Sequence, residues 1–163
     1  FNRVLTSDFA LLHGYGTQHF FVGRADIFFA SIHQDPRTSF PGTGFAHERG
    51  SGGGAGFTLN VPVPPGMCDE EYLQIFYDQV QPKLEEYKPD FVLVSAGFDA
   101  HRDDPLASLN LTERTFRELT RELRELAEQY AGGRIMSLLE GGYDLNALSS
   151  CVQEHLLILH AED

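Results

Sequence analysis

Residues 88–106 read KPDFVLVSAGFDAHRDDPL, and the FVLVS run at 91–95 decides the fold class. A continuously apolar run of this length is typical of a strand that is buried on both faces of a parallel sheet. The run leads into a loop rich in carboxylates, in which Asp99 is the first acidic residue. Because ligands of parallel α/β sheets sit beyond the carboxyl ends of the strands, this stretch predicts a strand and a functional edge together.

Similar segments alternate along the rest of the chain. We expect further strands at residues 3–7, 26–33, 57–63 and 134–139, and helices at 16–23, 69–88, 111–130 and from 144 onward. The prolines at and after the end of 57–63 indicate an edge strand or a strand end, whereas RIMSLL at 134–139 predicts another buried strand. This alternation predicts one α/β domain with three layers, a parallel sheet with helices on both faces.

The predicted helices carry clear local signals. Acidic residues open the helix at 69–88 and Pro82 is expected to bend its last turns, while Thr112 is the expected N-cap of the helix at 111–130. Asp144 opens the last helix, whose leucine and valine positions are expected to face the core: Leu145, Leu148, Val152, Leu156 and Leu159.

Composition limits the classes of partner. The 163 residues carry a formal net charge of −12, which argues against nucleic acid, because binding there depends on Lys and Arg at the phosphates. No apolar run reaches the length of a membrane span. Two cysteines cannot form a disulfide framework, so we expect the protein to reside in the reducing cytoplasm. The first residue is Phe1, from which a processed chain or a fragment is expected.

Three loops leave the predicted carboxyl ends of the strands, at residues 8–16, 98–106 and 140–143, and any site is expected where they meet. Asp99 suits a metal or a cationic group, whereas the alternative reading of this acidic loop takes Asp103 and Asp104 as turn residues before Pro105. Tyr143 suits a donor to a developing oxyanion, or it only covers the sheet edge. The GSGGGAG run at 50–56 precedes a strand, which excludes a dinucleotide fingerprint there.

Five stretches, taken together and in order, resemble the zinc-dependent histone deacetylase superfamily, particularly its bacterial deacetylase and acetylpolyamine amidohydrolase members. These are HGYGTQ, SIHQ with FPGTGF, GFTLNVPVPPG with DEEYL, KPDFVLVSAGFDAHRDDPL and LEGGYD. The resemblance implies the arginase/deacetylase fold and a hydrolase that removes acetyl groups from lysine or polyamine amines. It also implies a zinc ion with three protein ligands and one open position.

The resemblance assigns a role to several residues of this chain. Asp99 falls on a zinc ligand, Tyr143 on the tyrosine that stabilises the oxyanion, and Asp8 on an aspartate beside the zinc, near a structural monovalent cation. Positions around the acyl-lysine tunnel fall on Phe40, Leu106, Gly141 and Gly142.

The chain departs from the family pattern where two further ligands belong. The family reads D-x-D-x-H-H-G-x-G, in which the second Asp and the first His bind zinc, and here those positions hold Ala10 and Leu12. The family's tandem histidines lie upstream of Phe1, so an incomplete deacetylase-like domain that is inactive as this chain is expected.

Two alternatives remain open. The first is a non-catalytic binding or assembly module that forms a homo-oligomer or takes a complementary partner. The second is a hydrolase with a rearranged metal site built from Asp8, His13, Asp99 or His101, acting on an acetylated amine or peptide.

Overall fold

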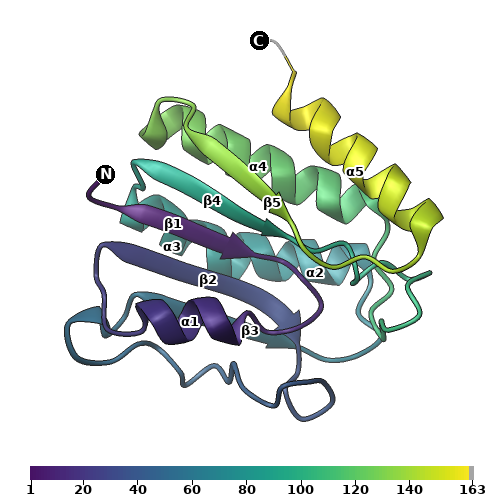
Figure 1. Cartoon of the computed structure of the whole chain (residues 1–163), viewed down its shortest axis with the longest axis horizontal. Helices are drawn as coiled ribbons and strands as arrows, with labels where there is room; N and C mark the ends of the chain where they lie inside the picture. The colour runs from purple at the N-terminus through teal and green to yellow at the C-terminus, as the bar shows by residue number, and fades with distance from the viewer. Residues whose placement is uncertain (162–163) are drawn as a thin grey trace.

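Five parallel strands form the sheet in the computed structural model, which describes residues 1–161 (Figure 1). Their order across the sheet is β3-β2-β1-β4-β5. The strands are β1 (Val4–Asp8), β2 (Ile27–Gln34), β3 (Thr58–Val63), β4 (Phe91–Ala96) and β5 (Ile135–Leu139). The predicted parallel α/β sheet is therefore confirmed, and β3 is an edge strand, as its prolines indicated.

At the edge where the candidate loops emerge, β1 ends before its two neighbours, which continue to Gln34 of β2 and Ala96 of β4. Asp8 closes β1 and is in register with Ser31 of β2 and Ser95 of β4. Since β1 is the middle strand, the segment that follows it lies between the loops that follow β2 and β4. The sheet thereby brings residues 9–16 to the centre of this edge.

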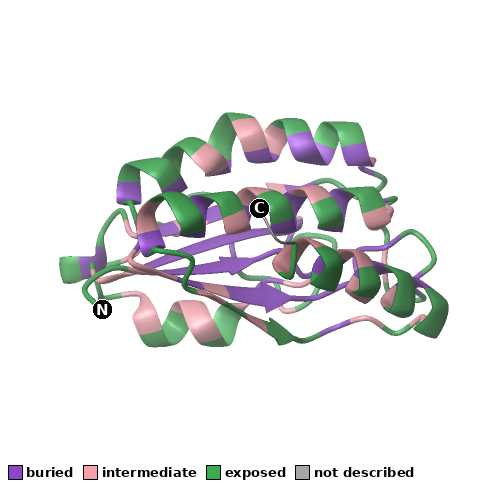
Figure 2. Cartoon of the chain, turned by 90° about the horizontal axis from the view of Figure 1, so that it is seen from above, coloured by how far each residue is buried: buried purple, intermediate pink, exposed green. Residues whose placement is uncertain are grey.

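Helices cover both faces of the sheet (Figure 2). One face carries the short helix α1 (Tyr15–Phe21), and the other carries α2 (Asp69–Ile75), η2 (Phe76–Val80), α3 (Gln81–Tyr87) and α4 (Glu113–Ala131). The last helix, α5 (Leu145–Leu159), packs against α4, and a single 3₁₀ turn, η1, spans Gly52–Gly54.

The helix predicted at 69–88 is divided into three segments. Its middle part, η2, is a π-helical turn, and Pro82 follows as one of the first residues of α3. A proline has no backbone N–H and its ring excludes the carbonyl four residues earlier, here that of Asp78. The distortion therefore begins before the proline, where a wider turn replaces the regular one.

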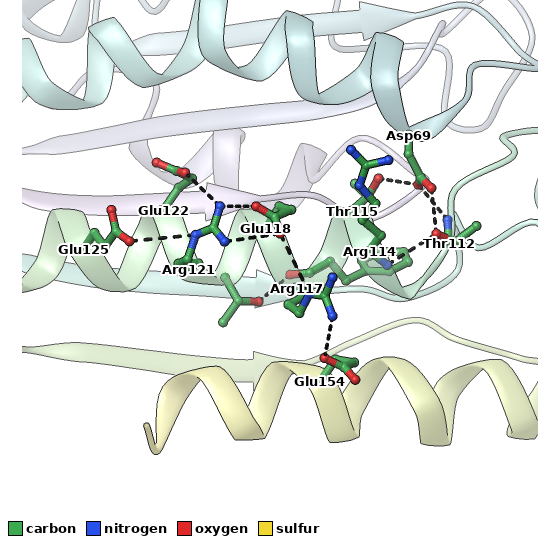
Figure 3. Close-up of polar contacts among 12 residues, drawn as sticks. Asp69, Thr112, Arg114, Thr115, Arg117, Glu118, Arg121, Glu122, Glu125 and Glu154 are labelled. Atoms are coloured by element: carbon green, nitrogen blue, oxygen red, sulfur yellow. Dashed lines mark hydrogen bonds and ion pairs between the residues drawn. The ribbon is translucent and has the colours of Figure 1, made fainter. Parts of the chain in front are cut away.

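A carboxylate from α2 fixes the start of α4 (Figure 3). Asp69 accepts hydrogen bonds from the backbone N–H and the hydroxyl of Thr112, at 2.8 and 2.6 Å, and from the hydroxyl of Thr115 at 2.5 Å. Thr112 in turn accepts from the N–H of Arg114 at 3.3 Å, which confirms it as the N-cap. The two helices are thus joined at the end that lies nearest the candidate loops.

Strand β5 is not the buried strand that its apolar sequence predicts. Met136, Leu138 and Leu139 are 51, 46 and 61% exposed. The prediction fails because Ser137 faces α5, to whose His155 it is hydrogen-bonded, so that Met136 and Leu138 point to the other face of the sheet and remain exposed there. An apolar run alone does not show which face of a strand a helix covers.

The inward face of α5 also differs from the prediction. Leu148 and Val152 pack against the core as predicted, but Leu145 is 78% exposed and Leu156 is exposed as well, and the fully buried residues are Ala147, Cys151 and His155. His155 is hydrogen-bonded through Nδ1 to Thr120 at 2.6 Å and through Nε2 to Ser137 at 2.7 Å. These two hydrogen bonds hold the His155 side of the helix inward.

None of the helices within residues 1–161 combines the length and the apolar character that a membrane span requires.

Candidate functional site

The three predicted loops meet around a cavity of about 440 Å³ at the carboxyl edge of the sheet. The segment after β1 contributes one wall, Asp99 lies beside it, and Glu140 to Tyr143 close it. Hydrogen bonds join the loops directly, since the N–H of Leu11 donates to Asp99 and the carbonyl of Gly141 accepts from the N–H of Phe98. The predicted meeting of the loops is confirmed.

Asp99 is held by backbone groups of two loops. Its Oδ1 accepts the N–H of Leu11 at 2.8 Å, and its Oδ2 faces Gly141, where an added Cβ would lie 2.4 Å from that oxygen. Burial raises the pKa of the Asp99 carboxyl, and the negative charges of Asp104 and Glu140 act in the same direction. Position 141 therefore requires glycine, because any side chain there would displace the carboxylate.

Asp8 lies behind the cavity wall rather than on it. Its Oδ1 accepts the N–H of Ala10 at 3.0 Å, and Oδ2 faces Gly14 closely enough that a Cβ there would clash. Burial raises the pKa of Asp8 to about 8, and the charges of Glu140 and Asp99 add to this effect. The carboxyl is thus a buried acid in an environment that favours its neutral form.

Tyr143 lies at the mouth of the cavity with an exposed ring. Its backbone N–H donates to Oδ2 of Asp104 at 2.6 Å, and Oδ1 of the same carboxylate accepts from Leu106 at 2.9 Å. The preceding Gly142 has a φ of +139°, a conformation that side chains disfavour, and a Cβ there would lie 2.8 Å from Leu148. Both constraints set the path of the chain that presents Tyr143.

Ala10 and Leu12 line the cavity on the side that faces Asp99. Ala10 is buried, and its methyl group lies so near Gly97 that a Cβ on that glycine would come within 2.4 Å of it. Neither side chain offers a lone pair. These two lining positions are therefore hydrocarbon.

Of the four residues predicted for the tunnel, Gly141 lines the cavity, whereas Phe40 and Leu106 are exposed and are not among its lining residues. The Phe40 ring lies 6.3 Å from that of Tyr15, which does line it. Their assignment to an acyl-lysine tunnel stays a prediction.

Of the two histidines considered as replacement ligands, His13 lines the cavity with both ring nitrogens hydrogen-bonded, and His101 lies outside the lining with its buried Nε2 lacking a hydrogen-bond partner among the described residues. His13 is hydrogen-bonded through Nδ1 to Thr43 at 2.9 Å and through Nε2 to Gln18 at 3.0 Å. His101 is buried outside the cavity lining, with Nε2 3.6 Å from a carboxylate oxygen of Glu113. Neither ring presents a nitrogen to Asp99.

The donor set does not fit a catalytic zinc ion. Such a centre needs three protein ligands and one open position. Over residues 1–161, no three His, Cys, Asp or Glu side chains come together in a way that could hold a metal ion. Besides Asp99, the cavity lining offers two groups of ligand type, Glu140 and His13, and both ring nitrogens of His13 are hydrogen-bonded to Thr43 and Gln18.

The long segment between β2 and β3 is anchored beside the cavity by Glu48. Its carboxylate accepts the N–H groups of Gly44 and Phe45, at 2.9 and 3.0 Å, and the side-chain amide of Gln18 at 2.7 Å. The backbone hydrogen bonds and that from Gln18 lower the pKa of Glu48 although burial opposes them. This anchor orients Gln18, which in turn holds His13.

Sequence reasoning did not single out Glu140 or Tyr15, although both lie in loops that were expected to meet at the site, and it took Asp104 for a turn residue. Glu140 stood in the quoted LEGGYD stretch, directly after a strand, and that position was the available signal. No local signal reveals Asp104, because its partner lies 39 positions away.

Comparison with known proteins gives one consistent result. Residues 1–159 match the family model described as the histone deacetylase domain. The chain is 44% identical over 161 residues, 99% of its length, to histone deacetylase 14, chloroplastic, of Arabidopsis thaliana. It is 41% identical over 141 residues, 86% of its length, to the histone deacetylase-like amidohydrolase of Pseudomonas aeruginosa.

Solved structures agree. The crystal structure of the HDA15 HD domain matches 97% of this chain with a TM-score of 0.88 and 36% identity, and the histone deacetylase Clr3 matches 97% with a TM-score of 0.90 and 34% identity. These matches confirm the predicted deacetylase-type fold. The chain spans 38 and 37% of the Arabidopsis and Pseudomonas proteins, and 44 and 27% of the two solved chains.

Proposed function

This chain belongs to the histone deacetylase family. From that premise we propose that it is part of a deacetylase-type domain, and that by itself it neither holds zinc nor hydrolyses amides. Its cavity serves instead as a binding site for a ligand on which it performs no chemistry. The observation that carries the proposal is that Ala10 and Leu12, at the two positions where the family pattern has ligands, line the same cavity as Asp99 with hydrocarbon side chains. Methyl and isobutyl groups donate no electron pair to a metal ion.

The remaining carboxylate supports the proposal. Asp99 is already committed through Oδ1 to the N–H of Leu11, and its environment favours the neutral acid more than water does. A single carboxylate with water as the other ligands holds zinc weakly. We therefore propose that this chain descends from enzymes that hydrolyse acetyl-lysine or acetylpolyamine amides but does not carry out this reaction itself.

A rearranged metal site is the weaker alternative. His13 uses both ring nitrogens and His101 lies outside the cavity lining, so either would need a loop displacement to reach Asp99. Asp8 would have to leave the backbone N–H of Ala10.

Metal analysis of the purified chain tests the proposal. After dialysis against a weak chelator we expect far less than one zinc per chain, and no acetate release from an acetyl-lysine peptide or from an acetylated polyamine. Stoichiometric zinc that is lost in Asp99→Ala would overturn the proposal, and so would acetate release that depends on Tyr143.

A second candidate function, assembly, is favoured by the apolar edge at β5. The strand carries no charged residue, and beside it α5 exposes Leu145, Leu156 and Leu157. Within residues 1–161 no strand pairs with the outer edge of β5, and an uncharged edge of this kind is a template for pairing with another chain. For a protein with a net charge of −12, an uncharged surface is where two copies repel one another least. We therefore propose a second copy of this chain as the partner.

The molar mass in solution tests assembly. We expect a dimer by size exclusion with light scattering, and a monomer for Leu138→Lys, which places a charge on the exposed strand. Phe20→Lys changes an equally apolar, exposed side chain on α1 and should leave the dimer intact. A monomer at high concentration in the unmodified chain would exclude this role.

A reducing compartment such as the cytoplasm suits two cysteines that are both free, Cys68 and Cys151. The net charge supports the absence of nucleic acid among the partners.

A further inference from the structure

We propose that a second cavity, at the amino edge of the sheet, binds a small aromatic carboxylate. The negative group of the ligand pairs with Arg3 and Arg49, and its ring packs on an aromatic wall. This cavity measures about 870 Å³ and lies where β1, β2 and β3 begin, at the edge opposite the candidate functional site (Figure 1). The inference therefore goes beyond the proposed function and does not depend on it.

Three stretches that are distant in sequence build this cavity. Residues 3, 25 and 28 contribute from the starts of β1 and β2, residues 49 and 56–59 from the segment that leads into β3, and positions within 78–87 from η2 and α3. The N–H of Gly56 donates to the carbonyl of Arg49 at 2.6 Å. The next residue, Gly50, has a φ of +89°, and a Cβ there would clash with the carbonyl of Gly54. These constraints hold the backbone of Arg49 beside the start of β3.

The first support is a pair of arginines without a counter-charge. Within residues 1–161 neither guanidinium group forms an ion pair, and Nε of Arg49 donates only to the carbonyl of Ala46, at 3.3 Å. The carboxylate of Asp90 accepts the backbone N–H of Arg3, at 3.2 Å, rather than its side chain. Most other arginines of the chain pair with a carboxylate. The two free guanidinium groups are therefore available to an anion, and their planar donors suit a carboxylate.

The second support is the formal charge of the lining. Lys83 and Glu86 form an ion pair at 2.8 Å and so offset one another. Asp78 is the other acid among the lining residues, and it accepts a hydrogen bond from the side-chain amide of Gln74 at 2.9 Å. Two arginines against this one acid leave a single uncompensated positive charge. A carboxylate balances that charge, whereas a doubly charged phosphate would bring an excess of negative charge.

The third support is the aromatic wall, which consists of Phe28, Phe57 and Tyr87. The ring of Tyr87 lies 5.1 Å from that of Phe28 and 6.0 Å from that of Phe57. Burial raises the pKa of the Tyr87 hydroxyl to about 12, so this wall stays uncharged beside an anion. Leu59 of the edge strand β3 extends the apolar surface. A ligand ring gains here from area burial and from edge or offset contacts between rings.

Calorimetry on the whole chain near neutral pH tests the inference with 3-phenylpropionate as the probe. The matched neutral ligand is 3-phenylpropionamide, which keeps the ring and the chain length but removes the charge. We expect the carboxylate to bind at least about tenfold more tightly than the amide. Equal affinity for the two ligands, or no binding of the carboxylate at millimolar concentration, would overturn the inference.

Variants locate the ligand. The double variant Arg3→Gln with Arg49→Gln keeps polar side chains but removes both charges, so affinity for the carboxylate should fall at least about tenfold. Both side chains are exposed, so the fold should persist, which thermal melting verifies. Arg37→Gln removes an exposed arginine that is paired with Asp35 and lies outside the cavity lining, and as the matched control it should bind like the unmodified chain.

Unchanged affinity in the double variant would reject the site. An equal loss in Arg37→Gln would also reject it, because the change in net charge alone would then account for the effect.

Discussion

Asp104, in the loop after β4, accepts the backbone N–H of Tyr143, in the loop after β5, with 2.6 Å between nitrogen and Oδ2. The other oxygen of the same carboxylate accepts the N–H of Leu106. One buried side chain therefore joins two walls of the cavity. The position of Tyr143 depends on this contact rather than on packing of its ring, which is exposed.

Replacing Asp104 with Ala should loosen both walls. Two backbone N–H groups lose their acceptor, and an unsatisfied buried donor costs about 1–3 kcal/mol of unfolding free energy. Urea denaturation should show a loss in that range, and hydrogen exchange should show faster exchange at Tyr143 and Leu106. Asp103→Ala, which removes the exposed neighbouring acid, should change neither. Unaltered exchange at Tyr143 would contradict the assignment.

Restoring donors at the two hydrocarbon positions should create a metal site. Ala10→Asp with Leu12→His places a carboxylate and an imidazole on the wall that faces Asp99, which completes three ligands. Calorimetry should show zinc binding at least about tenfold tighter than in the unmodified chain. Ala10→Asp alone should gain less. No gain in a double variant that remains folded would show that the loop geometry no longer suits a metal.

Acid should destabilise the chain through His155. Burial lowers the pKa of this histidine to about 4, so the folded state keeps it neutral between its ordinary value of 6.5 and that pH, while the unfolded state binds the proton. Its contribution to stability is complete above 6.5 and is lost as the pH falls towards 4, by about 1.4 kcal/mol per pH unit.

The pH dependence of urea unfolding measures this effect. His155→Asn should be less stable near neutral pH, since its contacts with Thr120 and Ser137 are disturbed, but its stability should fall less steeply with acid. The exposed His19 provides the control, and His19→Asn should keep the slope of the unmodified chain. Burial also lowers the pKa of His33 to about 4. His33 therefore makes a second loss of stability in acid, which remains in the His155→Asn variant.

Asp8 should change stability with pH in the direction opposite to His155, so that the folded chain loses stability as the pH rises. Because burial raises its pKa from 3.8 to about 8, the folded state binds a proton that the unfolded state has released between these two values. The stability that Asp8 contributes as a neutral acid is complete below 3.8 and is lost as the pH rises to 8.

Asp8→Asn removes this titration and leaves an oxygen for the N–H of Ala10. The difference in unfolding free energy between the variant and the unmodified chain should shift in favour of the variant from pH 4 to pH 8. A difference that stays constant over this range would show that Asp8 is solvated in the folded protein.

Much of the architecture could be predicted from sequence because it depends on local chemistry. The apolar FVLVS run formed a buried strand, Thr112 and Asp144 capped the helices that follow them, and the glycines at 132 and 133 ended α4. The rule that ligands gather at the carboxyl ends of parallel strands located the cavity. Each of these features follows from residues that are neighbours along the chain.

Other features depend on partners that are distant in sequence. The exposure of Leu138 follows from Ser137 facing α5, and the inward face of α5 follows from His155 finding Thr120 and Ser137. The acceptor role of Asp104 likewise needs Tyr143 beside it.

The sequence by itself determined which donors stand at positions 10, 12 and 99, since the identity of a side chain settles whether it has a lone pair to give. Only the tertiary structure decided that Asp99 and Glu140 face one cavity without a positive charge, because the field at a site is a sum over groups that folding alone brings together.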